Sequence, residues 1–324
     1  MESTAAPGEH IARLVRAHPG RKTLMPLIEV QNLVKHYGDV RAVDDLSFGV
    51  ESGTITGFLG PNGSGKTTTL RALLGLLTPT SGTATIGGRS YRALAAPLRE
   101  VGAMLEAAAH PSRSARKHLR ILSAEASVPR TRVEEMLRLV ELDGAADRRV
   151  GGFSLGMRQR LGLAGALIGD PGILVLDEPS NGLDPEGIRW LRDFLRSLAA
   201  EGRTILLSSH VLAEVAQTVD DVVVISSGRV VAQAPLDQLT SRTSQPIRVR
   251  SAQPEALAAA LRAGGLEALH DDGDAITVTG ASQQAVAQLA FDHGVVVYEI
   301  TAEASSLEDV FFTLTNAAPE EALR

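Results

Sequence analysis

Hydrophobic positions along this chain follow two alternating patterns. Short apolar runs bounded by glycine and polar residues indicate buried strands, whereas apolar residues three and four positions apart indicate helices. The first pattern predicts strands at residues 28–34, 40–50, 54–59, 83–87, 173–176, 204–208 and 222–226. The second predicts helices at residues 65–77, 113–124, 130–142, 155–168 and 185–199. This order predicts an α/β core built on a parallel sheet.

Two segments depart from this alternation. From about residue 90 to residue 169 the pattern is helical, which predicts a helical subdomain inserted into a domain at residues 27–240. A change of composition at residues 240–246, TSRTSQP, predicts a linker. Beyond it the order βαββαβ predicts a small ferredoxin-like α+β accessory domain at residues 245–324. Its last helix is predicted from a capping box formed by Ser305 and Glu308.

Composition narrows the classes of function. The net charge is −6 and no dense run of Lys or Arg occurs, so nothing favours nucleic acid as a partner. Cysteine is absent, which excludes disulfide bonds and thiolate chemistry. No apolar run approaches the roughly 18 residues that are needed to span a bilayer. We therefore do not expect the chain itself to form a pore.

Residues 1–26 have no predicted structure. They lack the continuous apolar core of a secretory signal. We expect residues 1–26 to be a disordered extension, or residues 1–24 to be absent from the native protein if Met25 is the true initiator.

The strongest local motif lies between a predicted strand and a predicted helix. Residues 60–68 read GPNGSGKTT, a full match to the phosphate-binding pattern G-x-x-x-x-G-K-[ST]. Its glycines allow backbone N–H groups to converge on phosphate oxygens at the start of the helix. Lys66 is expected to reach the β- and γ-phosphates and Thr67 to bind Mg²⁺. The candidate ATP-binding residues here are Gly60, Pro61, Asn62, Gly63, Ser64, Gly65, Lys66, Thr67 and Thr68.

A second motif supplies the carboxylates that such a site needs. The run ILVLDEP at residues 173–179 places Asp177 at the carboxyl end of a buried strand, where open α/β sheets bind ligands. Asp177 would hold Mg²⁺ through water. Glu178 would orient or deprotonate the attacking water.

With these motifs in order, the chain resembles the nucleotide-binding subunits of ABC transporters over about residues 28–240. The resemblance implies a P-loop NTPase fold of the ABC type. It also implies that Glu178 and His210 are the catalytic residues, His210 as the switch histidine that contacts the γ-phosphate. The remaining implied site residues are Tyr37 against adenine, the signature turn of Ser154, Leu155, Gly156 and Met157, and Asp184 in a loop that faces the other subunit.

What the family does follows from that signature turn, which acts on the ATP of another subunit. The resemblance implies a homodimer that closes around two ATP molecules with Mg²⁺ and opens after hydrolysis. This cycle would drive a separate transmembrane permease, with the chain bound peripherally at the cytoplasmic face of the membrane.

Two departures from the family pattern point to one of its branches. The signature reads FSLGM, with Leu155 and Met157 in place of the usual Gly and Gln, and Glu106 stands where a Gln is usual. Glu106 either ligates Mg²⁺, faces the permease or is merely solvated. Together with the ending LEDVFFTLT these features are similar to the ATPases of daunorubicin- and bacitracin-resistance pumps, which implies export of a drug, antibiotic or other hydrophobic compound.

Three other readings remain open at this stage. An ABC importer ATPase would share all the chemistry, although sugar importers usually carry a β-rich tail. A soluble ABC protein acting on ribosomes or DNA would usually have two cassettes or long coiled coils, and this chain has one P-loop. A regulatory module without catalysis would not be expected to retain Lys66, Asp177, Glu178 and His210.

Overall fold

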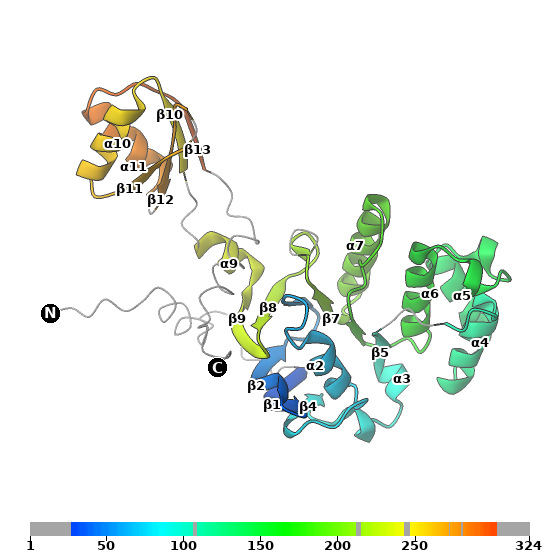
Figure 1. The fold of residues 1–324 in the computed structure, drawn as a ribbon. Coiled ribbons are helices and arrows are strands. Elements are labelled where there is room, and N and C mark those ends of the chain that lie inside the picture. Colours follow the sequence, from blue (N-terminus) through cyan, green and yellow to red (C-terminus); the bar gives the residue numbers. More distant parts are fainter. Residues whose placement is uncertain are drawn as a thin grey trace. The chain divides into compact units, whose positions relative to one another are not determined.

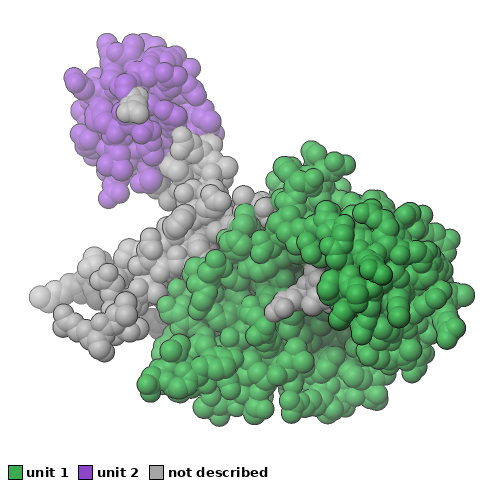
Figure 2. All heavy atoms as spheres, turned by 45° about the vertical axis from the view of Figure 1, so that its right-hand side comes forward, with its two compact units in different colours: residues 1–236, 314–324 green, residues 237–313 purple. Residues whose placement is uncertain are grey.

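The computed structural model describes residues 27–105, 109–211, 215–242, 247–271, 273–279 and 281–302 (Figure 1). The chain divides into two compact units, residues 1–236 with 314–324, and residues 237–313 (Figure 2). The extension predicted at residues 1–26 and the helix predicted from Ser305 lie outside the described residues. No helix of the described part is both long and apolar enough to cross a membrane.

A six-stranded sheet forms the centre of the first unit, in the order β5-β6-β7-β3-β8-β9. Its strands are parallel except β9, which pairs antiparallel with β8. Every residue of β3, β6 and β7 is buried, as expected of a parallel sheet covered on both faces. The strands are β3 (Ile55–Leu59), β5 (Val101–Met104), β6 (Ile173–Leu176), β7 (Thr204–Ser209), β8 (Asp221–Ser226) and β9 (Arg229–Pro235). The predicted parallel core is thereby confirmed.

A three-stranded antiparallel sheet, in the order β2-β1-β4, packs against this core. It consists of β1 (Ile28–Tyr37), β2 (Val40–Val50) and β4 (Ser81–Ile86). The two sheets share one hydrophobic cluster. Within it Phe48 of β2 stacks on Phe58 of β3, with ring centroids 5.0 Å apart. Aromatic stacking therefore fixes β3, which leads into the phosphate loop, against the antiparallel sheet.

The helices of the first unit agree with the predicted periodicity. The α2 helix (Lys66–Leu73) follows the phosphate loop, and α7 (Pro185–Ala200) lies between β6 and β7 in the chain. The helical subdomain contains α4 (Ala115–Glu125), α5 (Thr131–Leu139) and α6 (Leu155–Leu167), preceded by the short α3 (Pro97–Glu100). Single 3₁₀ turns lie at Tyr91–Ala93, Asp143–Ala145 and Val150–Gly152.

The helical prediction for about residues 90–169 is wrong at β5. Its sequence VGAM pairs with β6 at the edge of the central sheet. A four-residue apolar run cannot be distinguished from a piece of buried helix by periodicity alone. A Cβ atom at Gly102 would lie 2.1 Å from the carbonyl oxygen of Ala166, so this glycine lets β5 approach α6 closely. The strand thus joins the helical subdomain to the sheet.

The second unit has the predicted order βαββαβ. Its sheet runs β11-β12-β10-β13, and both helices pack on it around one hydrophobic cluster (Figure 1). The elements are β10 (Ile247–Ser251), α10 (Pro254–Ala263), β11 (Glu267–His270), β12 (Ala275–Thr279), α11 (Gln283–Asp292) and β13 (Val297–Ala302). One helix, α9 (Leu236–Arg242), was not predicted from the sequence, and it includes the first residues of the predicted linker.

Candidate functional site

The phosphate loop adopts the conformation that its glycines permit. Gly63 and Gly65 have φ angles of 82° and 103°, in the left-handed region that favours glycine. A Cβ atom at Gly65 would lie 2.6 Å from the carbonyl oxygen of Ala42, so glycine is also required sterically. Within the loop the hydroxyl of Ser64 is buried without a hydrogen-bond partner. An unpaired buried donor in this loop fits a site that binds phosphate oxygens.

Lys66 is almost completely buried, with 6% of its surface exposed. Its ammonium group donates hydrogen bonds to the carbonyl oxygens of Gly60 (2.7 Å) and Pro61 (3.2 Å). It also lies 3.4 Å from Oε1 of Glu178. A buried cation is tolerated when it is paired in this way. The loop lysine and the candidate catalytic carboxylate thus lie side by side.

Thr67 and Asp177 meet at the base of the same site. The Thr67 hydroxyl donates a 2.7 Å hydrogen bond to Oδ2 of Asp177, which follows β6. A hydroxyl and a carboxylate are the hard oxygen donors that Mg²⁺ prefers. Among the described residues no group of three or more His, Asp and Glu side chains could hold a metal ion. The hydroxyl and the carboxylate fit Mg²⁺, and phosphate and water oxygens would complete its coordination.

Glu178 is held by two neighbours on the next strand of the sheet. Oε2 of Glu178 lies 2.8 Å from Nδ1 of His210, which directly follows β7. The backbone N–H of Glu178 donates to the hydroxyl of Ser208 (2.9 Å), and that hydroxyl donates to Asp177. Glu178 has a φ of 49°, which is strained for a residue other than glycine. These contacts therefore hold a residue whose backbone is in a costly conformation.

Sequence reasoning did not identify Ser208. It is completely buried and contacts both residues of the acidic motif. The available signal was its position two residues before His210 in the strand TILLSS. That strand gives no indication of its partner, because the pairing of β6 with β7 is non-local.

The other predicted residues lie outside this cluster. Ser154 caps α6 by accepting a hydrogen bond from the N–H of Met157, and Asp184 caps α7 by accepting one from Gly187. Figure 1 shows α6 well separated from α2, which carries Lys66. Tyr37 ends β1 with 51% of its surface exposed and Lys35 5.1 Å from its ring centroid. Glu106 lies outside the described residues.

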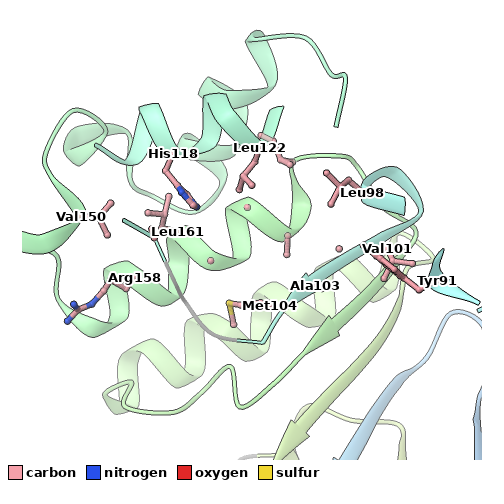
Figure 3. Close-up of a pocket in the computed structure, with 16 residues that line it drawn as sticks. Tyr91, Leu98, Val101, Ala103, Met104, His118, Leu122, Val150, Arg158 and Leu161 are labelled. Atoms are coloured by element: carbon pink, nitrogen blue, oxygen red, sulfur yellow. The ribbon is translucent and has the colours of Figure 1, made fainter. Parts of the chain in front are cut away.

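A cavity of about 220 Å³ opens between β5 and the helices α4 and α6 (Figure 3). Its lining is mainly apolar and includes Met104 and Leu161, with His118 and Arg158 as the basic members. Burial lowers the pKa of His118, and the charge of Arg113 lowers it further. Met104 also accepts a 2.7 Å hydrogen bond from the N–H of Asp177. One wall of the cavity is therefore bonded directly to the candidate Mg²⁺ ligand.

The fold and the site together define a P-loop ATPase of the ABC class, because the loop, the strand-end carboxylates and His210 meet on one parallel sheet that carries a helical subdomain. Residues 43–181 match the sequence profile described as ABC transporter, and residues 245–308 match a domain of unknown function. The chain is 38% identical over 296 residues to the bacitracin transport ATP-binding protein BcrA of Bacillus licheniformis. That match covers 89% of this chain and 97% of the relative. The chain therefore belongs to the ABC transporter family, as an ATP-hydrolysing subunit of the exporter type.

Two further comparisons agree with this assignment. The chain is 36% identical to the lantibiotic transport ATP-binding protein SrtF of Streptococcus pyogenes, over 65% of this chain and 92% of that protein. A solved structure described as the ATP binding subunit of an ABC transporter superposes with a TM-score of 0.60 and 29% identity. That superposition covers 67% of this chain and 92% of the other.

Proposed function

We propose that two copies of this chain bind two ATP molecules between them and drive a separate membrane permease that exports an antibiotic or another hydrophobic compound. One observation carries the dimer. Lys66, Asp177, Glu178 and His210 form a catalytic cluster, whereas α6, which Ser154 caps, is well separated in Figure 1 from α2, which carries Lys66. A second chain can supply the missing helix N-terminus to the γ-phosphate.

Within each site the residues have separate roles. The phosphate loop and Lys66 bind the β- and γ-phosphates, and Thr67 with Asp177 holds Mg²⁺, which neutralises phosphate charge. Glu178 positions or deprotonates the attacking water from a fixed geometry. His210 orients Glu178 and can reach the γ-phosphate, so it senses whether that group is present. Tyr37, exposed at the end of β1, is free to stack on the adenine ring.

The permease is proposed to dock at the cavity between β5, α4 and α6 (Figure 3). Its apolar lining suits an inserted side chain. Because Met104 is hydrogen-bonded to Asp177, a partner seated there contacts the strand beside the Mg²⁺ ligands. Docking and hydrolysis would thereby be coupled. The chain would then be a peripheral protein on the cytoplasmic face of the membrane.

The class of cargo rests on the relatives. Two of the relatives are named for transport of bacitracin and of a lantibiotic. An importer or a ribosome- or DNA-directed ABC protein finds no comparable support among them. Cargo contacts are expected in the permease rather than in this chain.

The principal experiment replaces Glu178 by Gln, which keeps the shape of the side chain and removes its charge. Purified protein with ATP and Mg²⁺ should hydrolyse ATP at least about 100-fold more slowly and accumulate as a dimer in light scattering. Glu255→Gln, at an exposed site in the second unit, is the matched control and should leave both properties unchanged. Normal turnover in Glu178→Gln would refute the catalytic role of Glu178.

The proposed roles of the accessory domain and of Glu106 are tested in membranes that contain the permease. Deletion of residues 245–324 should weaken membrane association or export, because we propose that this domain steadies the dimer or its permease contact. Glu106→Gln should change ATPase activity or export when the permease is present. If neither property changes in Glu106→Gln, that residue is simply solvated.

A further inference from the structure

The start of α6 packs against the loop that precedes α7, here called the dimer loop, residues 180–185. Cδ2 of Leu155 lies only 2.1 Å from the position that a Cβ atom would occupy at Gly182. Gly182 has a φ of 72°, which favours glycine independently. Beside it, Cδ2 of Leu183 lies 3.5 Å from the position that a Cβ atom would occupy at Gly156. Leu155 in its present position therefore requires glycine at residue 182.

Two more contacts link α6 to the dimer loop and to α7. The amide Nε2 of Gln159 donates a 3.4 Å hydrogen bond to the carbonyl oxygen of Asn181. The guanidinium of Arg160 lies 4.2 Å from the ring centroid of Trp190 on α7, an attractive cation–π distance. Residues four apart on a helix lie on one face, so Leu155 and Gln159 form a single seam. This seam joins α6 to the dimer loop and α7.

We propose that Leu155 is a positioning residue that wedges the signature turn, residues 154–157, against the dimer loop of its own chain. The two segments then present one surface to the phosphate loop of a second copy, so this inference rests on the proposed dimer. A glycine at residue 155, as the resembled family usually has, would leave no side chain to make the contact. With Leu155 present, ATP binding at the signature turn also places Asp184.

The test is a double-mutant cycle in the Glu178→Gln background. Gly182→Ala adds a methyl group on top of Leu155. Because 44% of the Leu155 surface is exposed, the side chain can rotate away and the protein should still fold. Displacement of the Leu155 side chain should weaken ATP-dependent dimerisation about tenfold. Leu155→Ala alone should also weaken dimerisation. The double variant should dimerise no more weakly than Leu155→Ala, because the methyl group added at residue 182 no longer collides with a leucine side chain at residue 155.

Two controls separate the wedge from general damage. Gly202→Ala places alanine at a φ of 92° with no atom within 4 Å, so it shares the backbone strain without the collision. Leu139→Ala removes a leucine from α5 whose exposure equals that of Leu155. Both should dimerise like the parent. Thermal unfolding, followed through the single Trp, should be similar for Gly182→Ala and Gly202→Ala.

The outcomes distinguish this inference from the function on which it rests. Additive losses in the double variant would overturn the wedge while leaving the dimer intact, as would undisturbed dimerisation in Gly182→Ala. If the Glu178→Gln parent forms no dimer with ATP, the proposed dimer is wrong and the wedge with it.

Discussion

Nδ1 of His210 lies 2.8 Å from Oε2 of Glu178, although the two residues are 32 positions apart in the chain. They follow adjacent parallel strands, β7 and β6, whose carboxyl ends meet at one edge of the sheet. The register of these strands therefore determines the geometry of the proposed catalytic pair.

His210→Ala should reduce the rate of ATP hydrolysis by about 10²-fold or more, because Glu178 loses the group that orients it. The affinity for ATP should change little, since the phosphate loop and Lys66 are intact. Steady-state kinetics and equilibrium binding of a fluorescent nucleotide measure the two effects. His270→Ala, at an exposed site in β11, is the control. An equal loss in both quantities would contradict a role confined to hydrolysis.

Ser208→Ala should lower kcat more than it raises KM. The substitution leaves the N–H of Glu178 and one oxygen of Asp177 without their partner. A buried group left unsatisfied in this way costs about 1–3 kcal/mol, which is about 5- to 150-fold if it appears in the rate. Ser123→Ala removes another buried serine hydroxyl, in α4, and should leave kcat unchanged. Similar kinetics for the two variants would contradict the assignment.

Asp170→Asn should lower thermal stability at neutral pH but not in strong acid. Hydrogen bonding to Arg203, with the charge of Arg132 nearby, lowers the pKa of Asp170 below its ordinary value of 3.8. A lowered carboxyl pKa contributes stability that is complete above the ordinary value and is lost as pH falls through the folded-state value. The Asp170 side chain is largely exposed. The effect should therefore not exceed about 1 kcal/mol.

Melting temperatures of the wild type and Asp170→Asn, compared at pH 7 and in strong acid well below the ordinary carboxyl pKa, measure this effect. Asn tolerates the left-handed φ of 58° at residue 170, so backbone strain should not confuse the result. A difference of equal size at both pH values would exclude the ionised carboxylate as its source.

Phe58→Ala should destabilise the first unit by about 3–5 kcal/mol, because it opens a cavity and removes the stacking on Phe48. Urea denaturation followed by Trp190 fluorescence reports this unit alone, since the chain has a single Trp. Phe291→Ala, at a side chain with 79% exposure in the second unit, should have no effect on that transition. If Phe58→Ala lowered the free energy of unfolding only slightly, the stacking would not be needed for stability.

The local parts of this structure could be predicted from the sequence and the long-range parts could not. The phosphate loop was predictable because its residues are contiguous and its glycines perform a known geometric task. By contrast, β5 was too short to distinguish from a helix, and β9 pairs antiparallel at the sheet edge, outside the parallel pattern that was expected. Ser208 and the contact of Leu155 with Gly182 depend on segments that are distant in sequence, for which one sequence carries no signal.

The left-handed backbone at Glu178 links the conformational stability of this protein to its rate of ATP hydrolysis. The folded chain gives up part of its conformational stability to hold one carboxylate at the point of reaction. Glycine at residue 178 would adopt this backbone without steric strain. We therefore expect Glu178→Gly to melt at a higher temperature than Glu178→Gln in calorimetry, with both inactive. The backbone strain at residue 178 would then lower the stability of this ATPase and, in return, hold its carboxylate where fast hydrolysis needs it.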